Sequence, residues 1–461
     1  MLLAGCGPSV DRYLLIESSL RAHDPKGADA VVERAEKEYG EKGRVLYGMD
    51  RGMTLHLAGE YQQSNAVLEQ AEEELDRLYT RKIRTETLAF MTNDTALPYE
   101  GDPYEQVLIN VLKALNYAML DQWQDALVEA RRIDHRLNVL SDQTQKTNAY
   151  RDDGFARYLS GILYETTGDV NNAFIAYRKA YETFDAARAW SHTAVPSQLQ
   201  QDLLRTAEAM HFTQELADYR SLFPDTRWET SAALQQLAQV IVISYNGRAP
   251  RKEDQFLDLP ISLDALQLVL LNRGVSQFNR QSNRGMDTLF YGLNGRVVRV
   301  ALPQLVPQKT HIAVDMVSLI PENGSQVMVR TELLNNVTAL ADKALSERMA
   351  EITAKALARA GTKFALAEGT TRAAEQAAGR DAGPLVGLLV GLLTKGFAVA
   401  SEEADKRSWQ TLPDEIHLGR VWVPPGRYQV HRFHDPLKAE GMRTLSLGPG
   451  ETAVLIQRVM P

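Results

Sequence analysis

The pattern that most constrains the fold is a helix-pair template that occurs three times in the first half of the chain. Residues 23–220 form amphipathic segments of about a dozen residues, which short polar turns join. In the best copy, a small residue in the first segment, Gly161, is followed by a second small residue, Ala173, and by the bulky Tyr177. Small residues let two helices cross closely, while the tyrosine fills the gap beside them. The template therefore predicts stacked helical hairpins.

This template resembles a degenerate tetratricopeptide repeat. The other two copies have the same spacing, at Gly52, Leu55, Gly59, Tyr61, Leu68 and Ala71 and at Ala114, Tyr117, Trp123, Ala126, Ala130 and Ile133. Their first small residues, at 52, 114 and 161, are 62 and 47 residues apart, whereas a regular array repeats every ~34 residues. We place the extra residues in loops around 92–103 and 141–148. A further helical pair, 196–209 and 213–222, is expected to cap the array.

A solenoid of such repeats presents the first helix of each pair on its concave surface. In the best copy we expect Phe155, Tyr158, Ile162 and Glu165 on this surface, with His56 in the first copy. These five residues are the candidate partner-binding site, as a groove for an amphipathic segment of another protein. The interpretation that we favour over an open groove is that the C-terminal half of the same chain covers them.

The second half of the chain changes to strand-like sequence. Residues 239–245 form a β-branched run that ends at the turn dipeptide Asn246-Gly247. Further apolar or alternating runs occupy 296–302, 310–318, 325–331, 420–423, 427–433, 445–447 and 452–459. The strands around Pro424-Pro425-Gly426 and after Gly448-Pro449-Gly450 resemble small β-sandwich modules of exported proteins. The expected fold class is α+β, a helical solenoid followed by a β-sandwich-like domain.

A helical insertion rich in alanine and glycine is expected inside the β-rich domain, at about 332–400. Its first segment has alanines every fourth residue, at Ala350, Ala354 and Ala358. Its second segment has glycines four apart, at Gly383, Gly387 and Gly391. These glycines leave a flat groove on which the alanines can pack. The apolar run 384–400 has 17 residues and contains Lys395, so it is short for a membrane span. We expect a buried helical hairpin; membrane insertion or self-association through the glycine face is the alternative.

Cys6, the only cysteine of the 461 residues, ends the sequence Leu3-Ala4-Gly5-Cys6. This sequence resembles a bacterial lipobox, which implies cleavage before Cys6, attachment of a diacylglycerol to its sulfur and attachment of a further acyl chain, such as palmitate, to its freed amine. Met1-Leu2 provides no charged or apolar signal-peptide region, so we expect the natural start to lie upstream. The alternative is a small buried cysteine. Gly7, where the inner-membrane signal has aspartate, implies outer-membrane retention by the same resemblance.

The composition argues against several classes of function. The chain has 51 Lys and Arg against 59 Asp and Glu, a net charge of −8, which disfavours nucleic-acid binding and attraction to anionic lipid. The nine histidines are scattered, and no His-Glu-x-x-His or Gly-x-Ser-x-Gly motif is present. His431 and His434 are close, but an odd separation on a strand places them on opposite faces. We therefore expect no enzyme activity, no catalytic residue, no metal site and no cofactor.

As a whole, the chain resembles an uncharacterised family of Gram-negative lipoproteins that join tetratricopeptide-like repeats to a C-terminal domain. The resemblance lies in residues 245–252 and 404–413, and it continues from the second stretch into residues 415–420. Within them we expect Trp409 to anchor the insertion on the sheet and Arg251-Lys252 to be exposed. The expected domains are a lipobox and tether at 1–22, helical repeats at 23–232 and the β-rich domain at 233–461.

The resemblance implies a location rather than an activity, namely lipid attachment to the outer membrane on its periplasmic face. The predicted function is a scaffold or adaptor that recruits envelope proteins of unknown identity through its repeats. One alternative is an activator of a peptidoglycan synthase or an accessory lipoprotein of a surface-export apparatus. Another is a hydrolase acting on cell-wall or lipid substrates.

Overall fold

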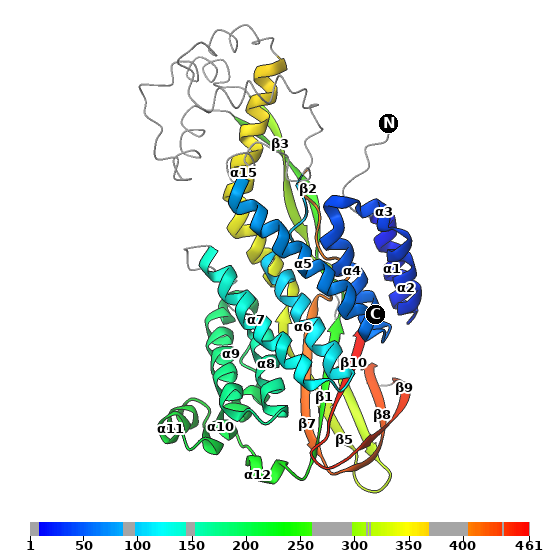
Figure 1. The fold of residues 1–461 in the computed structure, drawn as a ribbon, viewed down its shortest axis with the longest axis vertical. Helices are drawn as coiled ribbons and strands as arrows, with labels where there is room; N and C mark the ends of the chain where they lie inside the picture. The colour runs from blue at the N-terminus through cyan, green and yellow to red at the C-terminus, as the bar shows by residue number, and fades with distance from the viewer. Residues whose placement is uncertain are drawn as a thin grey trace.

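The helical half consists of antiparallel helix pairs that lie side by side (Figure 1). The computed structural model describes residues 9–85, 97–143, 153–260, 297–309, 312, 315–367, 404–435 and 438–460. The pairs are α4 (Arg44–Leu57) with α5 (Tyr61–Thr85), α6 (Pro103–Met119) with α7 (Trp123–Gln143), α8 (Gly154–Thr166) with α9 (Val170–Ser191), and α10 (Ser197–Ala209) with α11 (Thr213–Leu222). The last pair is the cap that the sequence predicts.

The helix crossings use the small residues of the template. A Cβ atom added to Gly161 on α8 would overlap the ring of Tyr177 on α9, and one on Gly52 would overlap Leu68 on α5. Ala173 has no exposed surface. Asp153 and Asp169 cap the N-termini of α8 and α9, because each carboxylate accepts a hydrogen bond from a first-turn amide. The predicted close crossing within these hairpins is confirmed.

The helical domain begins earlier than expected. Residues predicted to be a tether form α1 (Val10–Arg21), followed by α2 (Pro25–Arg34), α3 (Glu36–Tyr39) and the 3₁₀ turn η1 (Glu41–Gly43). Ser9 caps α1, the side chains of Ile16 and Leu20 are buried, and the Tyr13 hydroxyl donates to Asp50 at 2.8 Å. The tether prediction is therefore wrong from residue 9 onward, because α1 packs on the repeats.

Among its described residues, the β-rich domain contains two four-stranded sheets and a two-stranded ribbon. The first sheet has the order β10-β1-β7-β6 and the second the order β5-β4-β8-β9, while β2 pairs with β3. The short helix α12 (Ser231–Leu234) leads into this domain. The strands are β1 (Ala238–Asn246), β2 (Arg251–Pro260), β3 (Val297–Val306), β4 (Met316–Pro321), β5 (Val327–Arg330), β6 (Glu332–Asn336), β7 (Glu415–Val423), β8 (Gly426–Asp435), β9 (Lys438–Leu447) and β10 (Thr452–Val459).

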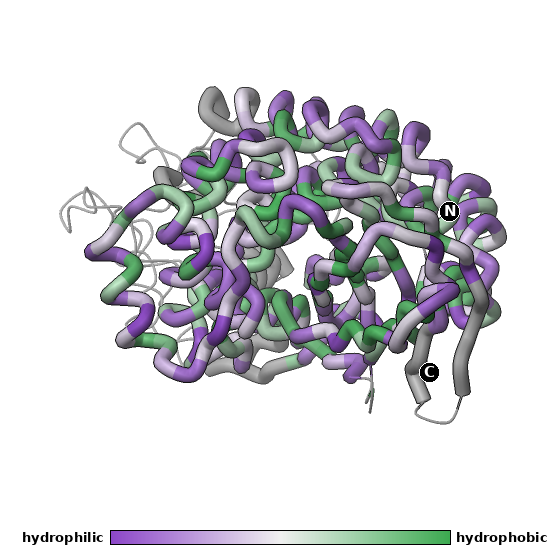
Figure 2. Tube along the Cα trace, turned by 90° about the horizontal axis from the view of Figure 1, so that it is seen from below, coloured by the Kyte–Doolittle hydropathy of each residue, from purple (hydrophilic) through white to green (hydrophobic). Residues whose placement is uncertain are grey.

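Strand β1 is buried on both faces. Val240 and Val242 share a core with Val317 and Val430 of the second sheet, which makes the two sheets a sandwich. The residues that alternate with them, such as Ile243, lie on the other face of the strand and belong to the core of the helical domain. The pairing is parallel with β10 and antiparallel with β7. Seen from below, the helix pairs curve around the strands (Figure 2).

The helical insertion is shorter at its start than predicted. Residues 332–336 form β6, which pairs with β7, so the helix α15 (Val337–Ala367) begins only after the Asn336 side chain accepts from the Ala339 amide at 3.0 Å. Gly383, Gly387 and Gly391 lie outside the described residues. Within the described part of the chain, no helix has the length and apolar character needed to cross a membrane.

Candidate functional site

The five predicted partner-binding residues lie between the repeats and the first sheet. His56, Phe155, Tyr158 and Ile162 are buried, and the Glu165 side chain is only 15% exposed. Strands β1 and β7 reach this face of α4 and α8 through the contacts given below. The prediction that these residues form an open surface for another protein is wrong for this structure. The other arrangement, in which the C-terminal half of the chain covers them, is the one observed.

An ionic network centred on Arg420 of β7 closes this interface. Arg420 contacts Glu165 and Asp202 at 2.8 Å each, and its side chain is 1% exposed. Arg205 contacts the same two carboxylates at 2.6 and 2.8 Å. The ring of Trp422 lies 4.5 Å from the Arg420 guanidinium and 4.9 Å from that of Arg205. Two cations and two anions thus neutralise one another in a buried seam.

The opposite charges in this seam shift the pKa values of Glu165 and Arg420 against the effect of burial. Burial opposes ionisation of Glu165, but Arg420 and Arg205 outweigh it and lower the pKa of this carboxyl to about 2. Burial also opposes the charge on Arg420, yet Asp202, Tyr177 and Glu165 raise the pKa of its guanidinium. Both shifts favour the ionised forms of Glu165 and Arg420 at neutral pH.

His56 links three elements in the same interface. Its Nδ1 lies 2.6 Å from Asn116 Oδ1 on α6, and its Nε2 lies 3.0 Å from the Tyr245 hydroxyl on β1. Burial lowers the pKa of His56 to about 4, although the bond to Asn116 opposes the shift. The ring is therefore neutral at physiological pH and serves as a hydrogen-bonding bridge between β1 and the repeats.

Residues 404–414 extend along the helices rather than returning to the sheet alone. The amide of the buried Trp409 donates to Glu105 on α6 at 2.8 Å, and the Thr411 hydroxyl donates to Asp50 on α4 at 2.9 Å. Lys252, which was expected to be exposed, is buried in an ion pair with Asp102 at 2.8 Å. The structure corrects both expectations, because the acidic partners come from α4 and α6.

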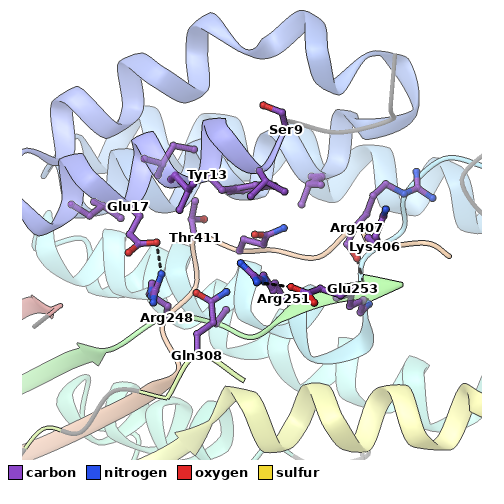
Figure 3. Close-up of a pocket in the computed structure, with 18 of the residues that line it drawn as sticks. Ser9, Tyr13, Glu17, Arg248, Arg251, Glu253, Gln308, Lys406, Arg407 and Thr411 are labelled. Carbon is purple, nitrogen blue, oxygen red and sulfur yellow. Dashed lines mark hydrogen bonds and ion pairs between the residues drawn. The ribbon is translucent and has the colours of Figure 1, made fainter. Parts of the chain in front are cut away.

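A cleft of about 850 Å³ opens between α1, the start of β2 and the segment 404–411 (Figure 3). One wall is apolar, because Val10 and Leu14 of α1 are 64% and 51% exposed and line the cleft. The opposite wall carries basic side chains, among them Arg248 and Arg251. The volume falls in the range of about 300 to 1,000 Å³ that small-molecule sites occupy.

Most of the charges in the cleft are paired. Arg248 contacts Glu17 of α1, and Lys406 contacts Asp254 at 2.6 Å. Arg458, at the end of β10, has no carboxylate partner among the described residues. Its Nη2 donates to the Leu412 carbonyl at 3.2 Å, while its buried Nε and Nη1 have no acceptor. Burial lowers the pKa of this guanidinium to about 10, so it is still charged at neutral pH.

The sequence did not indicate this cleft. Apart from Arg458, its basic side chains come from 245–252 and 404–413, the two stretches that carried the family resemblance. They are more than 150 residues apart in sequence, so only the fold brings them together. Cys6 lies outside the described residues. In the part of the chain that the structure describes, no group of three or more His, Cys, Asp or Glu side chains is arranged to hold a metal ion.

No protein-family model and no curated protein matches this chain. One similar solved structure is MamA of Desulfovibrio magneticus RS-1, from residue 41 to its end. It is 16% identical, and the match covers 48% of this chain and 96% of that chain with a TM-score of 0.29. A putative kinesin light chain of Podosopora anserina with TPR-like repeats is 14% identical, over 46% and 92% of the chains, with a TM-score of 0.31. The TPR2AB domain of yeast Sti1, in complex with pHSP90, is 13% identical, over 46% and 74%, with a TM-score of 0.20. At these scores the likeness assigns no partner.

Proposed function

We propose that this protein is a lipid-anchored scaffold on the periplasmic face of the outer membrane, where its helical repeats recruit another envelope protein. The observation that carries the proposal is that the repeats are joined to the sandwich by a complete ionic network, so the helix pairs form one fixed surface. Strands β1 and β7 fill the inner face, and the second helices of the pairs remain for a partner. Tyr79 on α5 and Val128 on α7 are each 41% exposed on these helices.

The anchor is tested at Cys6. The full-length chain, expressed with a complete signal peptide, should incorporate a fatty-acid probe and fractionate with the outer membrane. Cys6→Ala should remain unlabelled and uncleaved, because signal peptidase II acts only before the modified cysteine. An unlabelled wild-type protein would remove the lipid anchor from the proposal.

The recruiting surface is tested by placing a photo-crosslinking residue at Val128 and, as a matched control, at Met328. Met328 is 44% exposed but lies on β5 of the sandwich. We expect the Val128 variant to form one specific adduct in native membranes and the Met328 variant to form none. Equal adducts from both positions, or none from either, would contradict recruitment through the repeats.

Self-association through the glycine face at Gly383, Gly387 and Gly391 is a separate part of the proposal. If that face is buried within one chain, Gly387→Leu should lower the thermal stability of the soluble Cys6→Ala protein, because leucine forces two helix backbones apart. If it joins two chains or enters a bilayer, the variant should keep its thermal stability but lose dimer formation or flotation with liposomes.

A further inference from the structure

We propose that the cleft beside α1 binds a small single-chain anionic amphiphile, whose carboxylate or phosphate group is held by Arg458 and whose apolar chain lies along α1. The proposal depends neither on lipidation of Cys6 nor on a protein partner. It rests on the unpaired groups, the apolar wall and the size of the cleft.

Three arginines that line the cleft have unmet hydrogen-bond donors. The Nε atoms of Arg248, Arg251 and Arg458 are buried without an acceptor, as is Nη1 of Arg458. A buried donor without a partner is destabilising, and most such groups in proteins are satisfied. Carboxylate and phosphate oxygens are the acceptors that the fork of a guanidinium fits best. Arg458 lines the cleft and is only partly buried, so a turn of its guanidinium toward the cleft would let an anion supply these missing acceptors.

The acidic side chains of the cleft do not oppose such a ligand strongly, because each already has a cationic partner. Besides Glu17 and Asp254, whose partners are given above, Glu38 contacts Arg12 at 2.9 Å, Glu253 contacts Arg251 at 2.5 Å and Asp405 contacts Arg407 at 2.7 Å. Lys252 is neutralised by Asp102 from outside the cleft. The charge that remains without a counterion among the described lining residues is that of Arg458.

The apolar wall indicates the second half of the ligand. Of the eight large hydrophobic side chains that are exposed in the described part of the chain, three lie on α1, at Val10, Leu14 and Leu15. Val10 and Leu14 are four residues apart, so they lie on one face of the helix, and both line the cleft. An apolar chain lying on these two side chains would remove them from water.

The proposal is tested by calorimetric titration of the full-length Cys6→Ser chain, which needs no detergent. The probes are octanoate and octyl phosphate below their micelle concentrations, with octanol as the uncharged match. We expect one site per chain for both anions and no measurable binding of octanol. Arg458→Met should weaken binding by about tenfold to a hundredfold, as expected for losing a charge-assisted hydrogen bond. Arg427→Met, on the exposed part of β8, is the matched control and should leave affinity unchanged.

Two further variants separate binding from folding. Arg458→Met should unfold at the same temperature as the parent or higher, because the lost cation has no carboxylate partner. Leu14→Ser should weaken octanoate binding but leave the much weaker binding of acetate unchanged, since only the apolar chain contacts α1. Equal binding of octanol, octanoate binding that Arg458→Met leaves intact, or no binding at all would overturn the proposal. Binding confined to anionic vesicles, or seen only after deletion of residues 1–8, would also overturn it.

Discussion

Two arginines, the buried Arg420 and the partly buried Arg458, lie where the C-terminal strands meet the helices, and their surroundings differ. Around Arg420, Glu165 and Asp202 balance the charge, with Arg205 as the second cation of the network. Around Arg458 no carboxylate lies within ion-pair distance among the described residues, and two of its nitrogens have no acceptor. The pKa of Arg420 is raised by its anionic partners, whereas burial lowers that of Arg458 to about 10.

This difference distinguishes a structural contact from a candidate binding site. A neutralised network is stable only when both sides are present, so it joins the repeats to the sandwich and leaves no role for an outside partner. An unpaired cation at the edge of an open cleft has lost solvation without gaining a counterion. The surface that the repeat pattern predicts as a binding groove is therefore closed, and the site with unmet interactions lies beside α1.

The largest effect is expected from breaking the network. Arg420→Met leaves Glu165 and Asp202 with one cation, and removing one partner of a buried ionic network typically costs about 3 to 5 kcal/mol. Chemical denaturation of this variant should show a loss of that size, while the exposed control Arg427→Met should stay within about 0.5 kcal/mol of the parent. A loss below about 1 kcal/mol for Arg420→Met would mean that the seam is not formed in solution.

A smaller effect is expected at the helix crossing, which is independent of the seam's charges. Gly161→Leu inserts a side chain where the Tyr177 ring already lies, and Ala173→Leu overpacks the same hairpin, so each should cost about 1 to 3 kcal/mol. The comparison variant is Glu182→Leu, at an exposed position of α9. Thermal melting should show lower melting temperatures for the two crossing variants than for Glu182→Leu. Unchanged melting of both crossing variants would contradict the hairpin packing.

The pH dependence of stability should have opposite signs at two largely buried carboxyl groups, Glu165 in the seam and Glu105 on α6. The pKa of Glu165 is lowered to about 2, so its contribution to stability is present above its unfolded pKa of about 4.5 and is lost as the pH falls toward 2. Burial and the charge of Asp102 raise the pKa of Glu105, beneath Trp409, to about 7. Its contribution is present below about pH 4.5 and is lost as the pH rises through 7.

The check on this contrast is the free energy of unfolding of the parent and of Glu105→Gln at pH 5 and pH 8. The parent should lose stability relative to the variant by about 2 kcal/mol, because the native carboxyl keeps its proton until about pH 7 whereas the unfolded one loses it near pH 4.5. Parallel values at the two pH values would contradict the raised pKa of Glu105.

Most of the correct predictions came from patterns among residues that are close together in the sequence. The spacing of Gly161, Ala173 and Tyr177 determines a contact between helices that are adjacent in sequence, so the sequence alone predicted that contact. The β-branched run of β1 predicted a strand, but not that both of its faces are buried. The contact between Glu165 and Arg420 joins residues 255 positions apart, and no periodicity encodes it. The helix α1 was missed because Val10, Leu14 and Leu15 remain exposed and do not define a single buried face.

The central claim, that the inner face of the repeats is closed by the chain's own strands, is tested most directly by a double-mutant cycle between Glu165 and Arg420. The four proteins are the parent, Glu165→Gln, Arg420→Met and the double variant, each unfolded in denaturant near pH 7. Because the two side chains are 2.8 Å apart in a buried network, we expect a coupling energy of about 1.5 kcal/mol or more. A coupling energy near zero, with the single effects simply adding, would show that the face is open in solution and would contradict the claim.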